Sequence, residues 1–161
     1  MKDGFPPLAL TMGEPAGIGG EIALRAWLRR ADDVPVFLAI DDAERLRAIA
    51  RSLDLPVEVR PIDDAGEAAG VFAHALPVLH RPLPAACVPG RFDPANTRAA
   101  IGAIETAVGL VRSHRAAAVV TNPVHKRALY AAGFAYPGHT EFLAALANAV
   151  EAPVMMLASP C

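Results

Sequence analysis

Short apolar runs separated by helix-like segments limit the fold of this 161-residue chain more than any other feature. The runs are near-continuous rather than alternating, which is typical of strands buried on both faces of a parallel sheet. They occupy Leu8–Thr11, Val34–Ile40, Val57–Val59, Ala75–Leu79, Ala117–Thr121 and Val154–Leu157. Strands that alternate with helices predict a three-layer α/β/α fold with a mostly parallel sheet.

Helical periods fill several of the gaps between these runs. We expect helices over Glu21–Arg30, from Asp41 onward, and over Pro94–His114. Asp41 with Glu44 three residues later resembles a capping box, which would begin the second of them. Residues 60–95 are rich in proline, and a loop-rich hairpin or an edge strand is expected there.

Composition and charge exclude several classes of protein. Apolar residues make up 53% of the chain and the formal net charge is −2, so a packed globular protein is expected and nucleic acid is not an expected partner. No apolar run approaches the ~18 residues that suggest a membrane span, and no signal peptide is expected. Cys87 and Cys161 are too few for a disulfide framework, which favours a cytoplasmic location.

A glycine-rich stretch, "TMGEPAGIGGEIAL" over residues 11–24, joins the first strand to the first helix. Glycine permits tight turns and close ligand approach, and a helix start offers free N–H groups to an anion. Glu14, Gly17 and Gly19 are therefore candidate cofactor contacts. The spacing matches neither the dinucleotide fingerprint nor a P-loop, and a turn that needs glycine only for its geometry is the alternative.

A second polar segment, "VVTNPVHK" over residues 119–126, follows a buried strand. Ligands in open α/β sheets bind beyond the carboxyl ends of strands, so His125 and Lys126 are candidate ligand contacts. Lys126 would attract a phosphate or carboxylate. The alternative is a solvated lysine beside a histidine that caps a helix.

The third segment is "GFAYPGHTEF", residues 133–142. Gly133 is expected to end a helix, and Gly138 to precede another that begins with His139 and Thr140. The dipole of that helix would disfavour a cationic His139, leaving a neutral imidazole that can donate or accept a hydrogen bond. The alternatives are a structural histidine and an N-capping Thr140. We expect His139 to share a pocket with the glycine-rich turn.

The segments "MGEPAGIGGEI", "VVTNPVHKRALYAAGFAYPGHTEFLA" and "VMMLA" together resemble the 4-hydroxythreonine-4-phosphate dehydrogenase family of vitamin B6 synthesis. The three motifs occur in the family's order from end to end of the chain. Gly20 departs from the proline usual at its place. The resemblance implies a two-lobed fold akin to isocitrate and isopropylmalate dehydrogenases, incomplete in this chain, with residues 1–125 in the first lobe and residues 126–161 beginning the second.

The same resemblance implies a reaction. Members are homodimers that use NAD or NADP and a divalent metal (zinc, magnesium or cobalt). They oxidise and decarboxylate 4-phosphooxy-L-threonine, a small phosphorylated hydroxy-amino acid, to 3-amino-2-oxopropyl phosphate and CO2. The histidine and threonine of the "PGHTE" motif bind substrate in the family, which here implies His139 and Thr140.

The resemblance covers only the amino-terminal half of the family's chains. Motifs for a metal site are absent from this sequence, and the family's metal-binding histidines are expected beyond residue 161. The chain alone is therefore expected to be inactive. Related activities on a four-carbon sugar-acid phosphate or an aromatic dihydrodiol dicarboxylate, and a binding module without catalysis, are the alternatives.

Overall fold

A five-stranded sheet organises the chain, and all its strand pairs are parallel. The computed structural model describes residues 5–159, and the strand order is β3-β4-β2-β1-β5. The strands are β1 (Leu8–Thr11), β2 (Phe37–Asp41), β3 (Val59–Ile62), β4 (Leu76–His80) and β5 (Val119–Val120). The predicted α/β fold with a mostly parallel sheet is confirmed.

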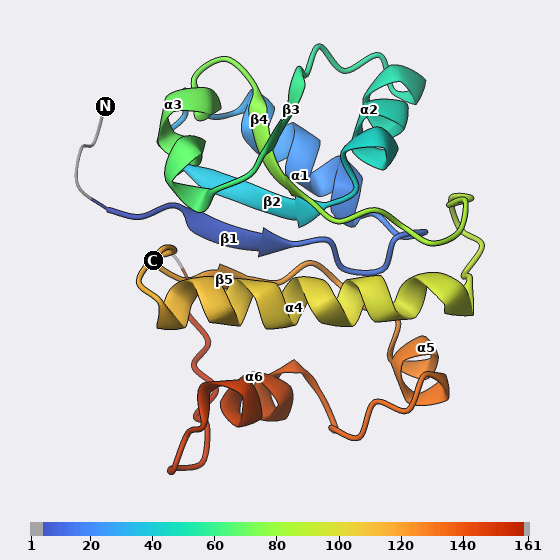
Figure 1. Ribbon diagram of the computed structural model, residues 1–161, viewed down its shortest axis with the longest axis vertical. Helices are drawn as coiled ribbons and strands as arrows, with labels where there is room; N and C mark the ends of the chain where they lie inside the picture. The colour runs from blue at the N-terminus through green and yellow to red at the C-terminus, as the bar shows by residue number, and fades with distance from the viewer. Residues whose placement is uncertain (1–4, 160–161) are drawn as a thin grey trace.

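Helices cover both faces of the sheet (Figure 1). They are α1 (Gly19–Leu28), α2 (Ala43–Ser52), α3 (Ala68–Phe72), α4 (Thr97–Arg112), α5 (Lys126–Ala131) and α6 (His139–Ala147), with short 3₁₀ turns at Ala65–Glu67 and Pro94–Asn96. Helices α1 and α2 pack on one face through large side chains such as Leu24 and Leu46. On the other face, Ala103 and Ala107 of α4 have no exposed surface, and their small size lets this helix lie close to the strands.

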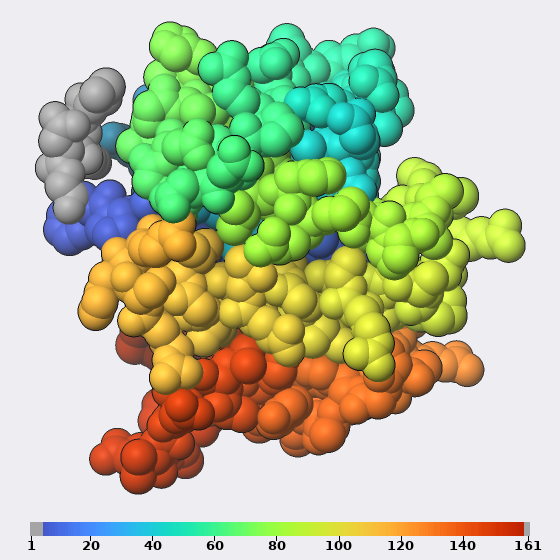
Figure 2. All heavy atoms as spheres, viewed as in Figure 1, coloured from blue at the N-terminus to red at the C-terminus, as the bar shows by residue number. Residues whose placement is uncertain are grey.

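The last part of the chain forms a further layer on α4. Helices α5 and α6 lie on the side of α4 that faces away from the sheet, and Figure 2 shows them as a separate orange and red block beneath the yellow helix. Arg112 Nη1 at the end of α4 donates to the Leu146 carbonyl of α6 at 3.0 Å. The boundary between two lobes near residue 125 stays a prediction.

The proline-rich region partly matches its prediction. Strand β3 lies at one edge of the sheet and contains Pro61, a residue tolerated at edges because it lacks a ladder N–H. The expected edge strand is therefore present. Its neighbour β4 runs parallel to it and not back as a hairpin, and the short helix α3 between them was not predicted from sequence.

Two local predictions are wrong. Asp42, not Asp41, caps α2, because its Oδ1 accepts the N–H groups of Glu44 at 2.8 Å and Arg45 at 3.1 Å. Asp41 is the last residue of β2 and points into the interior.

Val154–Leu157 form no strand, and each of their side chains is at least 75% exposed. A strand needs a neighbour to accept its hydrogen bonds, and none of the described strands pairs with this segment.

Two further findings concern the described residues 5–159. Cys87 carries a free thiol within this range, whereas Cys161 lies outside it. Within the same range, no helix has the length and apolar character needed to cross a membrane.

Candidate functional site

A small cavity between α5 and α6 contains the candidate histidine. Its volume is about 20 Å³, which is room for roughly one water molecule or one polar group of a ligand. Its walls come from the segment before α5, from α5 itself, from the loop between the two helices and from the first residue of α6. They are Val124, Lys126, Leu129, Tyr130, Phe134, Tyr136, Pro137, Gly138 and His139.

His139 is the first residue of α6, and Gly138 occupies the N-cap position in an extended conformation. The predicted helix start is confirmed, and Thr140 is not the cap. The imidazole Nε2 is buried and finds no hydrogen-bond partner among the described residues. An unmade hydrogen bond of this kind costs about 1–3 kcal/mol. A ligand atom in the cavity that bonded Nε2 would remove this cost.

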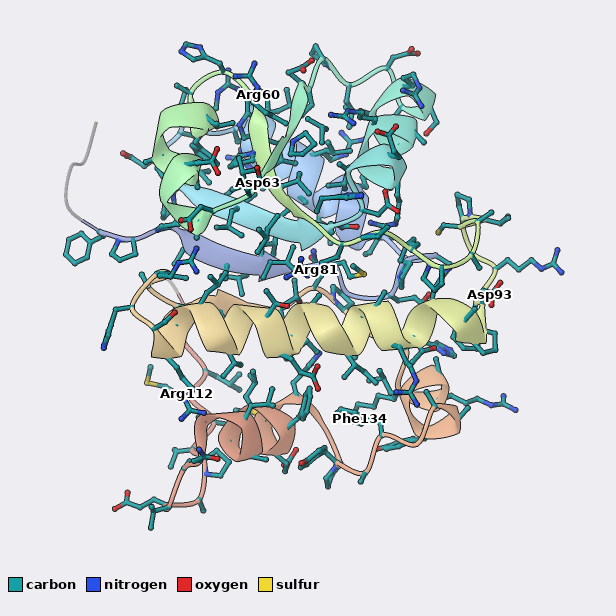
Figure 3. The ribbon with its side chains drawn as sticks, viewed as in Figure 1. Arg60, Asp63, Arg81, Asp93, Arg112 and Phe134 are labelled. Carbon is teal, nitrogen blue, oxygen red and sulfur yellow. The ribbon has the colours of Figure 1, made fainter. Side chains whose placement is uncertain are left out.

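An aromatic cluster holds this part of the chain. The rings of Phe134, Tyr136 and Phe142 contact one another with centroids 4.9–5.4 Å apart. Figure 3 shows the labelled Phe134 between α4 and the segment that joins α5 to α6. The Tyr130 hydroxyl donates to the Pro137 carbonyl at 3.0 Å, which ties α5 to the loop before His139. The aromatic cluster and this hydrogen bond therefore fix the segment that leads to His139.

The electrostatics favour a neutral imidazole. Burial lowers the pKa of His139 below its ordinary 6.5, and the nearby Lys126 cation lowers it further. The direction of this pKa shift was predicted from the sequence, but that prediction attributed the shift to the helix dipole. The causes found in the structure are loss of solvent around the imidazole and the charge of Lys126 at the start of the preceding helix.

We expect Lys126→Gln to raise the pKa of His139 while leaving it below 6.5, because burial remains. An NMR titration of the imidazole measures this pKa in the 161-residue chain. Arg127→Gln is the matched control, because it removes a neighbouring exposed cation that does not line the cavity. Equal shifts in both variants would contradict the assignment. Since protonation is disfavoured in the folded state, stability is expected to fall on acidification from pH 6.5 toward the lowered pKa.

Of the other candidate residues in these two motifs, one lines the cavity and two do not. Lys126, the first residue of α5, lines the cavity as expected. His125 lies outside the cavity lining, and its ring is 5.4 Å from that of Phe92, centroid to centroid. Thr140 is half-buried in the first turn of α6 and also lies outside the lining. Substrate contacts by His125 and Thr140 stay predictions.

The glycine-rich loop does not contribute to this cavity. The sequence predicted a pocket shared by His139 and the glycine-rich turn, but the cavity around His139 contains no residue of that turn. Gly17 is exposed, and the half-buried Glu14 accepts the Ala16 N–H at 3.1 Å. Both are placed where a ligand can reach the loop. Gly19 is buried, and a Cβ there would lie 2.6 Å from the Met12 carbonyl oxygen, so this glycine meets a packing requirement.

Two buried polar residues were not singled out from the sequence as contacts of this loop. Asn122 Nδ2 donates to the carbonyls of Thr11 and Gly19, and Arg45 Nε donates to the Pro15 carbonyl at 2.9 Å. A polar side chain directly after a buried strand was the one available signal for Asn122.

Other possible sites have less support. A broad hollow of about 490 Å³ runs from Arg47 to Val59 along α2 and β3, but it contains none of the candidate residues. Within residues 5–159, no three His, Cys, Asp or Glu side chains gather as a metal centre requires. The described part of the chain therefore does not fit the metal that the resemblance implies.

Comparison with known proteins extends these observations. Residues 33–161 match the family model described as "Pyridoxal phosphate biosynthetic protein PdxA". The chain is 54% identical over 162 residues to 4-hydroxythreonine-4-phosphate dehydrogenase of Methylorubrum populi, an alignment that covers 94% of this chain and 45% of that protein. The corresponding Bradyrhizobium diazoefficiens protein is 47% identical over 165 residues, with 96% and 48% covered. The chain thus spans about half the length of the curated relatives it matches.

Solved structures agree. The 4-hydroxythreonine-4-phosphate dehydrogenase of Burkholderia phymatum superposes with a TM-score of 0.82 at 31% identity, covering 92% of this chain and 46% of that one. The Klebsiella pneumoniae enzyme of the same name gives 0.76 at 35% identity, covering 88% and 44%. A terephthalate 1,2-cis-dihydrodiol dehydrogenase from Burkholderia xenovorans gives 0.65 at 27% identity, covering 87% and 41%.

Proposed function

Because this chain belongs to the PdxA family, we propose that it forms the amino-terminal half of a dehydrogenase that oxidises and decarboxylates 4-phosphooxy-L-threonine. The products would be 3-amino-2-oxopropyl phosphate and CO2, in the synthesis of pyridoxal phosphate. NAD or NADP, a divalent metal and a second subunit belong to the same proposal. Relatives that carry the dehydrogenase name support it, and they are about twice the length of this chain.

The observation that supports a ligand role most strongly is the imidazole of His139. Its buried Nε2 lacks a partner among the described residues, and His139 and Lys126 line the same cavity. A neutral imidazole can donate to a substrate oxygen or accept from a substrate hydroxyl. Lys126 carries a positive charge suited to a phosphate or carboxylate. The two side chains together would form one wall for a small, highly charged ligand.

The glycine-rich loop is the proposed cofactor contact. Gly17 and Glu14 lie at the accessible part of this loop, and the carboxylate of Glu14 would accept a ribose hydroxyl. A bound nicotinamide would accept the hydride from the substrate's hydroxyl-bearing carbon. We assign no step to the metal, because the described residues offer no site for it.

The test uses the chain alone and fused to the carboxyl-terminal remainder of the Methylorubrum populi relative. We expect the chain alone not to reduce NAD⁺ or NADP⁺ with 4-phosphooxy-L-threonine, and the fusion to reduce one of them. His139→Ala in the fusion should lower kcat/KM by about tenfold to hundredfold, the loss of a hydrogen bond worth about 1–3 kcal/mol. Absorbance of the reduced nicotinamide follows both reactions.

The matched control is His74→Ala, which removes an exposed histidine remote from the cavity lining. Equal rates for His139→Ala and His74→Ala would refute a ligand role for His139. Turnover by the chain alone would refute the expectation that the second half is required. A fusion that folds but turns over none of the family's substrates would favour a binding module without catalysis.

Likeness to the terephthalate dihydrodiol dehydrogenase favours a second candidate, oxidation of an aromatic dihydrodiol dicarboxylate. Its identity of 27% is lower than that of the relatives with the threonine-phosphate name. Giving the fusion each substrate in turn, together with a four-carbon sugar-acid phosphate, separates the alternatives by their kcat/KM values.

A further inference from the structure

Asn122 joins two motifs that are far apart in the sequence. Its side chain is buried, and its Nδ2 donates to the Thr11 carbonyl at 2.9 Å and to the Gly19 carbonyl at 3.3 Å. Its backbone N–H donates to Thr11 Oγ1 at 3.3 Å. The next residue, Pro123, accepts the Glu14 N–H at 2.8 Å. These bonds connect the end of β1 and the glycine-rich loop to the segment that leaves β5.

The two motifs also pack without a gap. A Cβ on Gly13 would lie 2.5 Å from the Pro123 carbonyl oxygen and 2.8 Å from Asn122 Cβ. A Cβ on Gly19 would lie 3.1 Å from Asn122 Cβ. Contacts this close leave neither segment room to move toward the other. The position of Asn122 is therefore set by the glycine-rich loop.

The chain leads directly from this contact into the cavity. Val124, two residues after Asn122, lines the cavity, and so does Lys126 at the start of α5. Pro123, which lies between Asn122 and Val124, has a fixed φ, and this limits the flexibility of the chain between Asn122 and the cavity. A shift of Asn122 would therefore move two of the residues that surround the His139 imidazole.

We propose that Asn122 is a positioning residue, which locks the segment 123–126 against the glycine-rich loop and so sets where Lys126 lies relative to His139. The proposal deepens the proposed function, on which it rests for the role of His139 in binding. In this proposal, the buried part of the glycine-rich loop fixes the position of residues 123–126, in addition to the proposed cofactor contact. The side-chain amide of Asn122 would then fix the proposed substrate contacts and the proposed cofactor contacts relative to each other.

Asn96 provides a matched control for the test. It is buried to a similar degree, 2% exposed against 4% for Asn122, and its side chain also makes two hydrogen bonds to backbone. Its partner is Ala85 in the loop before α4, and neither residue lines the cavity. Asn96→Ala and Asn122→Ala should therefore lose similar stability, while only Asn122→Ala should disturb His139.

The readout is the NMR titration of the His139 imidazole in the 161-residue chain. In Asn122→Ala, we expect the pKa of His139 to rise toward 6.5, because Lys126 is no longer held beside it. In Asn96→Ala, we expect it to stay at the wild-type value. An unchanged His139 pKa in Asn122→Ala, or equal changes in the two variants, would overturn the proposal. If Asn122→Ala does not fold, Thr11→Val, which removes only the hydroxyl acceptor of the Asn122 N–H, gives the same test in milder form.

This titration needs no substrate, so it separates the positioning role from the proposed function. Suppose that Asn122→Ala raises the pKa of His139 in the 161-residue chain but the fusion enzyme is inactive. The positioning role would then stand, and the dehydrogenase assignment would not. In an active fusion, Asn122→Ala should raise KM more than it lowers kcat. Recovery of KM in Asn122→Ser, which restores a short polar side chain, would further support positioning. If Asn96→Ala changed kcat and KM as much as Asn122→Ala does, that result would count against it.

Discussion

Replacing Asp41 with asparagine is expected to lower the free energy of unfolding by about 3–5 kcal/mol, the typical cost of leaving one buried charge without its partner. Both Asp41 carboxylate oxygens accept from Arg45 Nη1 at 2.8 Å, and both side chains are at most 4% exposed. Burial raises the pKa of Asp41, and the Arg45 cation opposes that rise. The asparagine amide would leave this cation buried without a carboxylate.

Glu21→Gln is the control for this change. Glu21 and Arg25 also form a carboxylate–arginine pair four residues apart and 2.8 Å long, here within α1, but their side chains are 39% and 57% exposed. An exposed pair contributes about 0–1 kcal/mol. Urea unfolding followed by circular dichroism measures both variants. Similar losses in the two variants would show that burial does not decide the contribution of the Asp41 pair.

Arg45 has a second task that a double replacement would expose. Its Nε bonds the Pro15 carbonyl, so Arg45→Met with Asp41→Leu removes the buried charges and also one support of the glycine-rich loop. Because buried ion pairs can often be replaced by apolar residues at little cost, the double variant should recover much of the loss. The part that is not recovered reports the support given to the loop together with the bond that the Asp42 N–H donates to Asp41 Oδ1 at 2.7 Å.

Gly13→Ala is expected to be the second most damaging change, at about 3 kcal/mol or more. Gly13 has φ +67°, which costs a residue with a Cβ about 1–2 kcal/mol. The new Cβ would also lie 2.5 Å from the Pro123 carbonyl oxygen, a backbone atom that can move away only if the Asn122-Pro123 segment moves with it. Overpacking of this kind typically adds about 1–3 kcal/mol. Thermal and urea unfolding would measure the total.

Gly90→Ala separates the two causes. Gly90 has a similar φ of +74°, but nothing lies within 4 Å of its added Cβ. Gly90→Ala should therefore lose only the cost of the left-handed conformation, about 1–2 kcal/mol. If Gly13→Ala were no worse than Gly90→Ala, the close packing between the glycine-rich loop and Asn122-Pro123 would have no energetic weight.

The segment Val154–Leu157 illustrates a limit of sequence patterns. Its composition predicted a strand as strongly as that of Leu8–Thr11, yet only the latter has neighbours in the sheet. The apolar run is local information, whereas strand formation requires a second segment in register. The capping error at Asp41 has a similar origin. Asp41 and Asp42 are chemically identical caps, and the pairing of β2 decides which of them faces inward.

The sequence by itself determined the α/β class, the positions of all five strands within a few residues, the start of α6 at His139 and the direction of the shift in its pKa. These properties follow from hydrophobic period, helix-stop residues and local chemistry, all of which act over a few neighbouring residues. The tertiary structure alone decided that Asn122 binds Thr11, which is 111 residues away, and that burial and the Lys126 cation lower the pKa of His139. Such contacts depend on how distant segments pack, and no local pattern encodes which pair will meet.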